Sequence, residues 1–222
     1  MGLPERVWLL RHAETTAPHV LNGSESDVEL SELGKLQAIA LGEWFKPLGI
    51  TAVVSSAMKR AIATAKPIAE YSHVPRSIEP ALHERRIGAL SGQRFDLASG
   101  PWAETIHHWT SGNGAFTTTG AESFDEIADR VIPAWNSALK ANPEGRVVIV
   151  AHGIVCKVLL LMLLEGHSVK DWNAIGRSSN GSISELVPFG TGKWKANQMF
   201  EVPESLSALN AKALDQAPRS EG

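Results

Sequence analysis

Cationic and imidazole side chains follow three separate runs of the sequence that are typical of β-strands. Arg11 and His12 come directly after the first run, and Arg60 lies a few residues beyond the second. His152 follows the third, most apolar run. Because the carboxyl ends of parallel strands meet at one edge of an open α/β sheet, these side chains are expected to converge there. Guanidinium groups bind phosphate, and an imidazole can be a nucleophile or an acid–base group, so the pattern predicts a site for a phosphoryl group.

The elements that must position these side chains are alternating strands and helices. The alternation predicts an α/β fold, a three-layer α/β/α sandwich with a mostly parallel central sheet and helices on both faces. Strands are predicted at 6–10, 51–55, 77–79 and 146–150, followed by a hairpin at 183–187 and 194–197. Helices are predicted after Ser31, after Ser56, and at 102–109, 122–141, 154–164 and 205–214.

Serine and proline residues mark where two of the helices should begin or bend. Ser31 and Ser56 are expected to be N-caps, because their side-chain oxygens can accept a backbone N–H. Pro67 is expected to kink or restart the second helix, because proline lacks the N–H that the helix needs. The apolar positions of the first helix recur at helical spacing, at Leu33, Leu36, Ala40 and Trp44.

Length and composition exclude several classes of protein. The chain has 222 residues, of which 43% are hydrophobic, and this suits one well-filled domain. A net charge of -3 without a basic stripe argues against nucleic-acid binding. The single cysteine, Cys156, allows no internal disulfide and no Cys-x-x-Cys motif. The apolar stretch 147–164 is broken by polar residues, and the first residues lack a signal-peptide pattern, so no membrane association and a cytoplasmic location are expected.

The segments that carry this chemistry resemble, in the same order, the motifs of the histidine phosphatase superfamily, also called the phosphoglycerate mutase-like family. Residues 10–15 are similar to the Arg-His-Gly signature of one branch, with Ala13 where glycine is usual. The stretch that follows the signature is matched by Asp27, Leu30, Gly34, Gln37 and Ala38, and the second motif is matched by 55–61 with Thr64 and Ala65. The acid loop of the family is matched by Leu82, Glu84, Gly88 and Gly92. Its late helix is matched by Gly120, Glu122, Ser123 and Arg130, and its second histidine motif by 151–153.

The resemblance implies a phosphoglycerate mutase-like organisation. A single domain is expected at residues 1–202, with a variable, lid-like insertion at about 93–120. Residues 203–222 are expected to form a tail with one helix and a frayed end. The aromatic side chains in the insertion could line a substrate pocket or pack the lid, and packing is the favoured interpretation of Trp102, Trp109, His107, His108 and Phe116.

The resemblance also implies roles for individual residues. His12 would attack phosphorus and carry the phosphoryl group as phosphohistidine, while Arg11, Arg60 and His152 would bind its oxygens. Glu84 would protonate the leaving oxygen and then activate water. The loop residues Asn22 and Gly23 would add phosphate contacts. No metal ion and no cofactor are expected, because the arginines supply the charge that Mg²⁺ supplies elsewhere.

Two reactions remain open within this resemblance, hydrolysis and phosphoryl transfer back to a bound sugar acid. Ile87 stands where mutases of the family carry tyrosine, and residues 17–19 are Ala-Pro-His instead of their Trp-Asn. The arginine pair that holds the mutase substrate has no counterpart between Gly92 and Gly120. Hydrolysis of a small phosphorylated metabolite is therefore favoured. A cofactor-dependent phosphoglycerate mutase is the alternative, and a non-catalytic binding domain of the same fold is the third.

The remaining titratable side chains are expected to have no catalytic role. His107 and His108 lack the carboxylate or cysteine partners of a metal site, and Cys156 is expected to be a buried helix residue. The edge of the predicted hairpin is exposed and leaves a homodimer open. The other histidines expected to be non-catalytic are His19, His73, His83 and His167.

Overall fold

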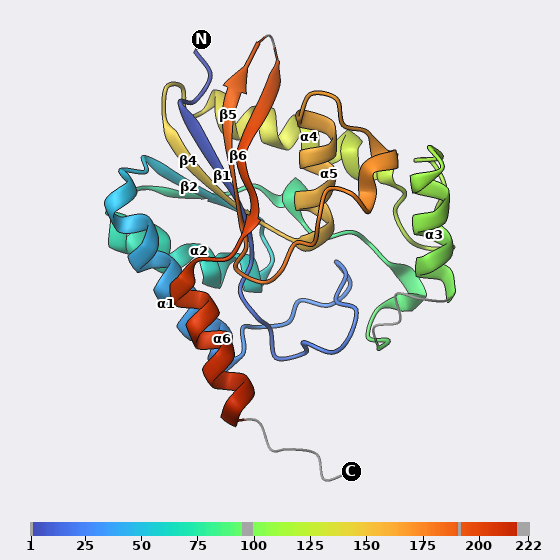
Figure 1. Cartoon of the computed structure of the whole chain (residues 1–222), viewed down its shortest axis with the longest axis horizontal. Helices are drawn as coiled ribbons and strands as arrows, with labels where there is room; N and C mark the ends of the chain where they lie inside the picture. The colour runs from blue at the N-terminus through green and yellow to red at the C-terminus, as the bar shows by residue number, and fades with distance from the viewer. Residues whose placement is uncertain (1, 95–99, 191, 217–222) are drawn as a thin grey trace.

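A six-stranded sheet forms the centre of the computed structural model, which describes residues 2–94, 100–190 and 192–216 (Figure 1). Its strand order is β3-β2-β4-β1-β5-β6. The first four of these strands are parallel, and β5 and β6 are antiparallel, so the sheet is mostly parallel as predicted. The strands are β1 (Arg6–Arg11), β2 (Ala52–Ser55), β3 (Arg76–Ile78), β4 (Arg146–Ala151), β5 (Ile183–Phe189) and β6 (Lys193–Glu201).

Helices cover both faces of this sheet (Figure 1). The helices α1, α2 and α6 lie on one face, and α4 and α5 lie on the other. The predicted three-layer sandwich is therefore confirmed. The helices are α1 (Glu32–Phe45), α2 (Lys59–Ser72), α3 (Gly100–Thr110), α4 (Phe124–Lys140), α5 (Gly153–Leu163) and α6 (Glu204–Gln216), with short 3₁₀ turns η1 (Lys46–Leu48), η2 (Pro80–Leu82), η3 (Gly88–Leu90) and η4 (Val169–Trp172).

The alternation of side chains along β1 divides the hydrophobic core into two parts. Val7 and Leu9 pack into the core under α4 and α5, and Trp8 and Leu10 pack into the core under α1 and α2. Both faces of the strand are thus buried, as a continuous apolar run in a parallel sheet requires. Burying each such side chain stabilises the fold by about 1.5–3 kcal/mol.

The first helix begins where it was predicted but buries a different face. The Ser31 side chain accepts a hydrogen bond from the Gly34 amide at 2.9 Å, which confirms the cap. Leu36, one of the apolar positions used to predict the helix, is 51% exposed. Close packing on α2 and α6 selects a face with small and polar members instead, namely Gly34, Gln37, Ala38, Leu41, Gly42 and Phe45.

One prediction for the second helix was wrong. Ser56 is not its N-cap, since α2 begins at Lys59 after Met58, and the Ser56 hydroxyl lies beside a histidine ring. Pro67 does not restart the helix, which runs on to Ser72. Gly42 of α1 packs directly on this turn, where an added Cβ would lie 2.9 Å from the Pro67 carbonyl oxygen. Only glycine allows the two helices to approach so closely at this point.

The lid-like insertion and the tail each contain one helix. The helix α3 lies in the expected insertion, at the edge of the molecule and next to η4 (Figure 1). The helix α6 covers the stretch in which a tail helix was expected, and it packs on α1. Residues 95–99 of the insertion and the tail end at 217–222 lie outside the described residues. Within the described part of the chain, no helix is both long and apolar enough to cross a membrane.

Candidate active site

The ends of β1, β2 and β4 bring the predicted site residues together. Arg11 is paired with Ala151 in the parallel register of β1 and β4, so the residues that follow them emerge side by side. The His12 amide donates to the Ala151 carbonyl at 3.0 Å, and the Ser56 amide donates to the Val150 carbonyl at 3.0 Å. The residues that follow β1 and β2 thus continue the sheet against β4 for one position before the chains diverge, and the carboxyl edge of such a sheet is where open α/β folds bind ligands.

The His12 ring is held as a neutral imidazole. Its Nδ1 atom lies 2.7 Å from the Ala13 carbonyl oxygen. Because a carbonyl oxygen can only accept a hydrogen bond, Nδ1 carries the proton and Nε2 is unprotonated. Burial lowers the pKa of His12 well below 6.5, and the charges of Arg11 and Arg60 lower it further. A neutral imidazole with an unprotonated Nε2 can act as a nucleophile near neutral pH.

His152 lies against this ring and is fixed at both nitrogens. The centroids of the His12 and His152 rings are 5.1 Å apart. Arg60 donates from Nε to Nδ1 of His152 at 3.3 Å, so the opposite nitrogen, Nε2, carries the proton and donates to the Ser56 hydroxyl at 2.9 Å. Burial lowers the pKa of His152 well below 6.5, and this histidine is therefore neutral as well.

Backbone carbonyls fix the two arginines. Because these partners are neutral, the hydrogen bonds orient the guanidinium groups without neutralising their positive charge. Arg60 is buried and donates to the carbonyls of Ser26 at 2.8 Å, Gly23 at 3.3 Å and Asn22 at 3.4 Å. Arg11 donates from Nη1 to the Ser178 carbonyl. Among the described residues, the buried Nε atom of Arg11 has no hydrogen-bond partner. A buried donor without a partner costs free energy unless a ligand accepts from it.

Glu84 lies close enough to both arginines for its charge to raise the pKa of each. Its carboxylate accepts from the amide of its neighbour Arg85 at 2.8 Å and from the amide of Ile154 at 3.3 Å. Ile154 lies in the first turn of α5, which begins directly after His152. The acid loop and the second histidine motif are therefore joined by one hydrogen bond. The Glu84 side chain is 7% exposed, so its carboxyl group is almost completely shielded from bulk water.

An ion pair outside the site holds the loop on which Glu84 lies. Arg130 of α4 binds Glu122 at 2.8 Å and donates to the carbonyls of Ala81 and His83 at 2.7 and 2.8 Å. Glu122 in turn accepts from the Arg86 amide at 2.7 Å. Burial raises the pKa of Glu122, but the hydrogen bonds from Arg130 and the Arg86 amide outweigh it, and the net pKa is lowered. The carboxylate stays ionised and the loop is fixed on both sides of residue 84.

The comparisons with known proteins decide the family. The model of the histidine phosphatase superfamily (branch 1) matches residues 7–201. The chain belongs to this superfamily.

Relatives of known name agree with this assignment. A metal-independent phosphoserine phosphatase of Arabidopsis thaliana is 34% identical over 200 residues, which is 87% of this chain and 80% of the relative. A probable phosphoglycerate mutase of Cronobacter sakazakii is 30% identical and covers 96% of this chain and 99% of its own. The structure of a mycobacterial glucosyl-3-phosphoglycerate phosphatase superposes with a TM-score of 0.77 at 27% identity, covering 90% of this chain and 99% of its own. The chain is therefore a phosphatase of the histidine phosphatase superfamily.

Three residues of this histidine phosphatase site were given no role in it from the sequence, although Ser56 and Thr64 belong to the second motif; Asn180 was not singled out at all. Ser56 holds His152, Thr64 accepts from the Ala13 amide at 3.0 Å, and Asn180 donates to the carbonyls of His12 and Ala13 at 3.1 and 3.2 Å. Thr64 lies one turn after Arg60, and this spacing is a signal in the sequence that could have indicated it. Asn180 has no such signal, because its loop reaches His12 only through the folded sheet.

The loop residues Asn22 and Gly23 reach the site through their backbone. Their carbonyl oxygens accept from Arg60, while the Asn22 side chain donates to the Ala17 carbonyl at 2.7 Å. Gly23 has no space for a side chain, since an added Cβ would lie 2.9 Å from the Arg85 carbonyl oxygen. The structure thus places both residues against Arg60, where they fix the orientation of its guanidinium group.

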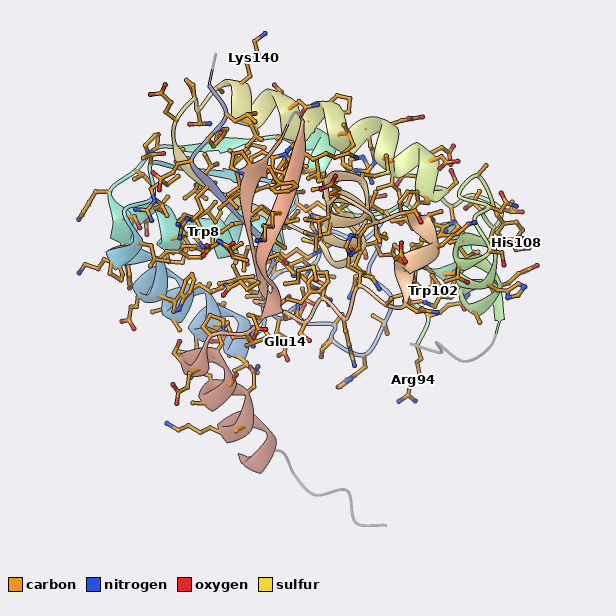
Figure 2. All side chains as sticks on the ribbon, turned by 45° about the horizontal axis from the view of Figure 1, so that its top comes forward. Trp8, Glu14, Arg94, Trp102, His108 and Lys140 are labelled. Atoms are coloured by element: carbon orange, nitrogen blue, oxygen red, sulfur yellow. The ribbon has the colours of Figure 1, made fainter. Side chains whose placement is uncertain are left out.

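The aromatic residues of the insertion pack on one another, whereas Cys156 is buried close to the site, where its amide donates to the His152 carbonyl at 2.8 Å. Trp109 is fully buried in the lid core, and His108 stacks on Phe116 at 3.7 Å, at the outer edge of α3 (Figure 2). Cys156 is buried, and burial raises the pKa of its thiol, so the sulfur is protonated. Within the described residues, no cluster of three or more His, Cys, Asp or Glu side chains is arranged as metal ligands.

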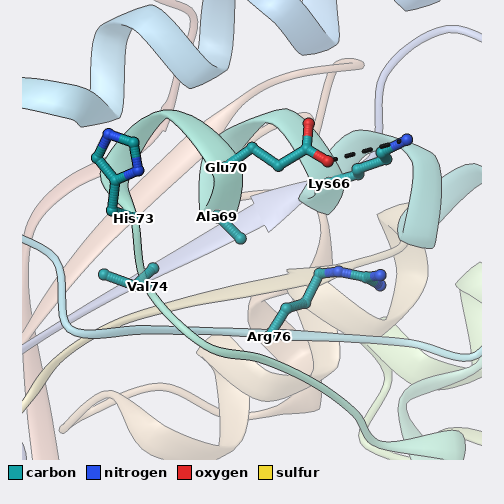
Figure 3. A pocket seen from close by; sticks show the side chains of 6 residues that line it. All are labelled: Lys66, Ala69, Glu70, His73, Val74 and Arg76. Carbon is teal, nitrogen blue, oxygen red and sulfur yellow. Dashed lines mark ion pairs between the residues drawn. The ribbon is translucent and has the colours of Figure 1, made fainter.

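A surface pocket of about 440 Å³ lies between the end of α2 and β3 (Figure 3). Lys66 and Glu70 form an ion pair of 3.9 Å on one wall, and none of the site residues lines it. The pocket is at the C-terminal end of a helix, where the carbonyl dipoles disfavour an anion. We therefore assign the chemistry to the buried centre around His12. The pocket is lined by Lys66, Ala69, Glu70, His73, Val74 and Arg76.

Proposed function

We propose that this protein hydrolyses small phosphorylated metabolites through a phosphohistidine intermediate on His12, without a metal ion. One observation carries the proposal. The hydrogen bond from Nδ1 of His12 to the Ala13 carbonyl leaves Nε2 as a bare nucleophile beside two buried arginines. This combination of an unprotonated nitrogen and fixed positive charge suits attack on a phosphate dianion, because a dianion repels an anionic nucleophile but not a neutral one.

In the first step, Nε2 of His12 forms a bond to phosphorus and the bond from phosphorus to the ester oxygen breaks. Charge then accumulates on the three equatorial oxygens, where Arg11 and Arg60 supply donors that need no reorganisation. The unpartnered Nε of Arg11 is the donor that supports this role most directly. The leaving oxygen takes its proton from Glu84, which must enter this step protonated.

In the second step, the phosphoryl group is transferred to water. The Glu84 carboxylate left by the first step accepts a proton from a water molecule as its oxygen attacks phosphorus. The bond between Nε2 and phosphorus breaks, and inorganic phosphate leaves. Glu84 is then protonated again and His12 is again neutral, so the cycle closes without a metal ion or another co-reactant.

His152 acts in this scheme through both of its neighbours. It accepts from Arg60 and lies against the ring that becomes phosphorylated. We assign it to orienting Arg60 in the resting site and to contacting a phosphoryl oxygen once the group is bound. Asn22 and Gly23 belong to the same assembly, because their carbonyls fix the other side of the guanidinium.

The substrate class is that of small organic phosphates. The relatives include a phosphoserine phosphatase and a glucosyl-3-phosphoglycerate phosphatase, and both names denote an organic phosphomonoester. The helix α3 of the expected lid lies at the edge of the fold and packs on η4 (Figure 1). A cytoplasmic location and a homodimer stay predictions.

The test is hydrolysis of p-nitrophenyl phosphate and phosphoserine in the presence of excess EDTA. Turnover is expected to survive chelation and to disappear in the His12→Ala variant. A rapid acid or alkaline quench should reveal a phosphoprotein that is stable to alkali and labile to acid, as phosphohistidine is. Activity that persists in His12→Ala would refute the nucleophile, and activity that EDTA abolishes would refute the metal-independent scheme.

A phosphoglycerate mutase is the second candidate, and the named relative from Cronobacter sakazakii favours it. A mutase must keep its phosphorylated intermediate away from water while the sugar acid rotates. Incubation with 3-phosphoglycerate, with and without 2,3-bisphosphoglycerate, separates the two reactions. We expect release of phosphate in both mixtures. Formation of 2-phosphoglycerate without phosphate release would show that the protein is a mutase and not a phosphatase.

A further inference from the structure

Lys157 is a half-buried lysine whose charge no acidic side chain balances. Its Nζ atom lies 4.4 Å from the ring centroid of Trp172, and among the described residues it forms no ion pair and no hydrogen bond. Burial lowers its pKa to about 8, and no neighbouring charge contributes to this shift. Removing an ammonium group from water is unfavourable, and a cation–π interaction with one aromatic ring offsets only part of the lost hydration free energy. A lysine in this setting is therefore suited to bind an anion.

The tryptophan that Lys157 contacts belongs to a cluster of three tryptophans. Trp172 lies 4.8 Å from Trp109 and 6.3 Å from Trp102, measured between ring centroids. Arg85, the residue after Glu84, places its guanidinium 5.2 Å from Trp102 and 5.0 Å from Trp109. Two cations thus contact one aromatic cluster from different segments, and only Arg85 has its charge balanced by nearby carboxylates, Glu84 and Glu122.

The position of Lys157 on α5 relates it to the reacting atoms. Ile154, three residues earlier, binds the Glu84 carboxylate through its amide, and Gly153 lies against Arg11, where an added Cβ would be 3.4 Å from Cζ. Residues 153, 154 and 157 share one helix face, and helical side chains lean towards the N-terminus. Lys157 therefore lies on the side of α5 that faces the acid and one arginine, one turn behind them.

The leaving group must occupy the space beyond Glu84. Glu84 protonates the ester oxygen, so the organic part of the substrate extends away from the arginines and His12. The first turn of α5 binds the Glu84 carboxylate, and η4 packs on both α5 and α3. Trp102 of α3, labelled in Figure 2, is half-buried and lies 6.3 Å from Trp172 of η4, measured between ring centroids.

We propose that Lys157 binds a second anionic group of the substrate, a carboxylate or a second phosphate on the leaving alcohol. This assignment rests on the proposed function and adds a specificity-determining residue to it. The preferred substrates are then phosphomonoesters with an acidic leaving group, and the tryptophan faces hold the ammonium group in place when no substrate is bound. Arg85 is fully buried by the lid and is assigned to packing, since no side of its guanidinium reaches solvent.

Matched substrate pairs test the proposal. Phosphoserine differs from phosphoethanolamine by one carboxylate, and 3-phosphoglycerate differs from glycerol 3-phosphate in the same way. Fructose 1,6-bisphosphate against fructose 6-phosphate tests a second phosphate. We expect the wild-type protein to prefer the acidic member of at least one pair, and Lys157→Met to lower kcat/KM for that member by about 10- to 100-fold. The neutral member and p-nitrophenyl phosphate should change by less than about threefold.

Two further variants separate recognition from structure. Lys157→Arg keeps the cation and should retain most of the preference for the acidic member. Lys170→Met removes an exposed lysine from η4 and should leave all ratios unchanged. If Lys157→Met lowers activity on both members equally, or leaves the preference intact, the lysine is structural and the inference is overturned while the proposed function stands.

Direct binding keeps the inference independent of turnover. In the His12→Ala background, calorimetry with 3-phosphoglycerate and glycerol 3-phosphate measures the same difference without hydrolysis. We expect Lys157→Met to remove the tighter binding of 3-phosphoglycerate selectively. If the wild type hydrolyses no phosphomonoester, the proposed function fails, and this binding ratio still decides the role of Lys157. An unchanged ratio overturns it.

Discussion

The Nδ1 atom of His12 donates to the carbonyl oxygen of Ala13 across 2.7 Å, and this contact fixes which nitrogen of the ring can react. Moving the proton from Nδ1 to Nε2 would place the Nδ1 lone pair against a carbonyl oxygen, which would exchange an attraction for a repulsion. Asn180 donates to the same carbonyl, so Ala13 is held from a second side. The backbone therefore selects the tautomer in which Nε2 is unprotonated.

The phosphoryl group is expected on Nε2 of His12 and not on Nδ1. Rapid quenching of the wild type during turnover, followed by phosphorus NMR of the denatured protein, distinguishes the two isomers of phosphohistidine. His12→Ala is the control, and it should yield no phosphoprotein. Detection of the Nδ1 isomer would mean that the resting hydrogen bond to Ala13 does not survive in the reacting complex.

Acid should destabilise the protein through its two buried histidines. The folded-state pKa values of His12 and His152 lie well below 6.5, so the unfolded chain binds more protons as the pH falls below about 6.5. Stability is then fully present above that pH and decreases below it, by about 1.4 kcal/mol per pH unit for each histidine.

Urea unfolding between pH 5 and pH 7.5 measures this effect. The slope of unfolding free energy against pH should be smaller in His12→Gln than in the wild type by about one proton. Comparing the two proteins removes the shared contribution of the carboxylates. Equal slopes in both would contradict the assignment of a neutral, buried His12.

Arg130 is expected to matter most for substrates with poor leaving groups. It fixes the backbone around Glu84 through the carbonyls of Ala81 and His83, so Arg130→Gln should misplace the acid. General acid catalysis contributes about 10²–10⁴-fold, and we expect a loss of about 10- to 100-fold with alkyl phosphates. p-Nitrophenolate leaves without protonation, so its ester should be affected much less.

The control for this prediction is Arg86→Gln, which removes an exposed arginine from the same loop. Steady-state kinetics with a series of aryl and alkyl phosphates gives the dependence of rate on the leaving-group pKa. That dependence should become steeper in Arg130→Gln and stay unchanged in Arg86→Gln. A uniform loss over the series would show that the ion pair with Glu122 supports the fold alone.

Thr64 should be needed for the geometry of the nucleophile loop. Its hydroxyl accepts from the Ala13 amide at 3.0 Å and donates to the Arg60 carbonyl at 2.7 Å. Thr64→Val keeps the shape but leaves a buried amide unpaired, at a cost of about 1–3 kcal/mol. The melting temperature and kcat of Thr64→Val should both be lower than those of the wild type, and Thr64→Ser should restore both. Unchanged kcat in a destabilised Thr64→Val would separate this contact from catalysis.

Local patterns in the sequence were sufficient to predict the sheet and to place four candidate site residues at one of its edges. Apolar runs of five residues predicted β1, β2 and β4, because a strand buried on both faces needs only its own residues to be recognised. The Ser31 cap was predicted for the same reason, since its partner Gly34 is three residues away. Arg11, His12, Arg60 and His152 could be placed near each other because parallel strands share one carboxyl edge.

The tertiary structure alone decided the contacts that tune these residues. Arg60 and His152 are 92 positions apart, and His12 and Asn180 are 168 positions apart, so neither pair has a signature in any local window. Ser56 was predicted to be a helix cap, and only the folded chain brings it to His152. The sequence gives no sign that Lys157 lies against Trp172. Their environments depend on burial and on which crossovers bring α5, η4 and the acid loop together. Types and spacing determined which residues could react, and the packing of distant segments decided their protonation, orientation and charge balance.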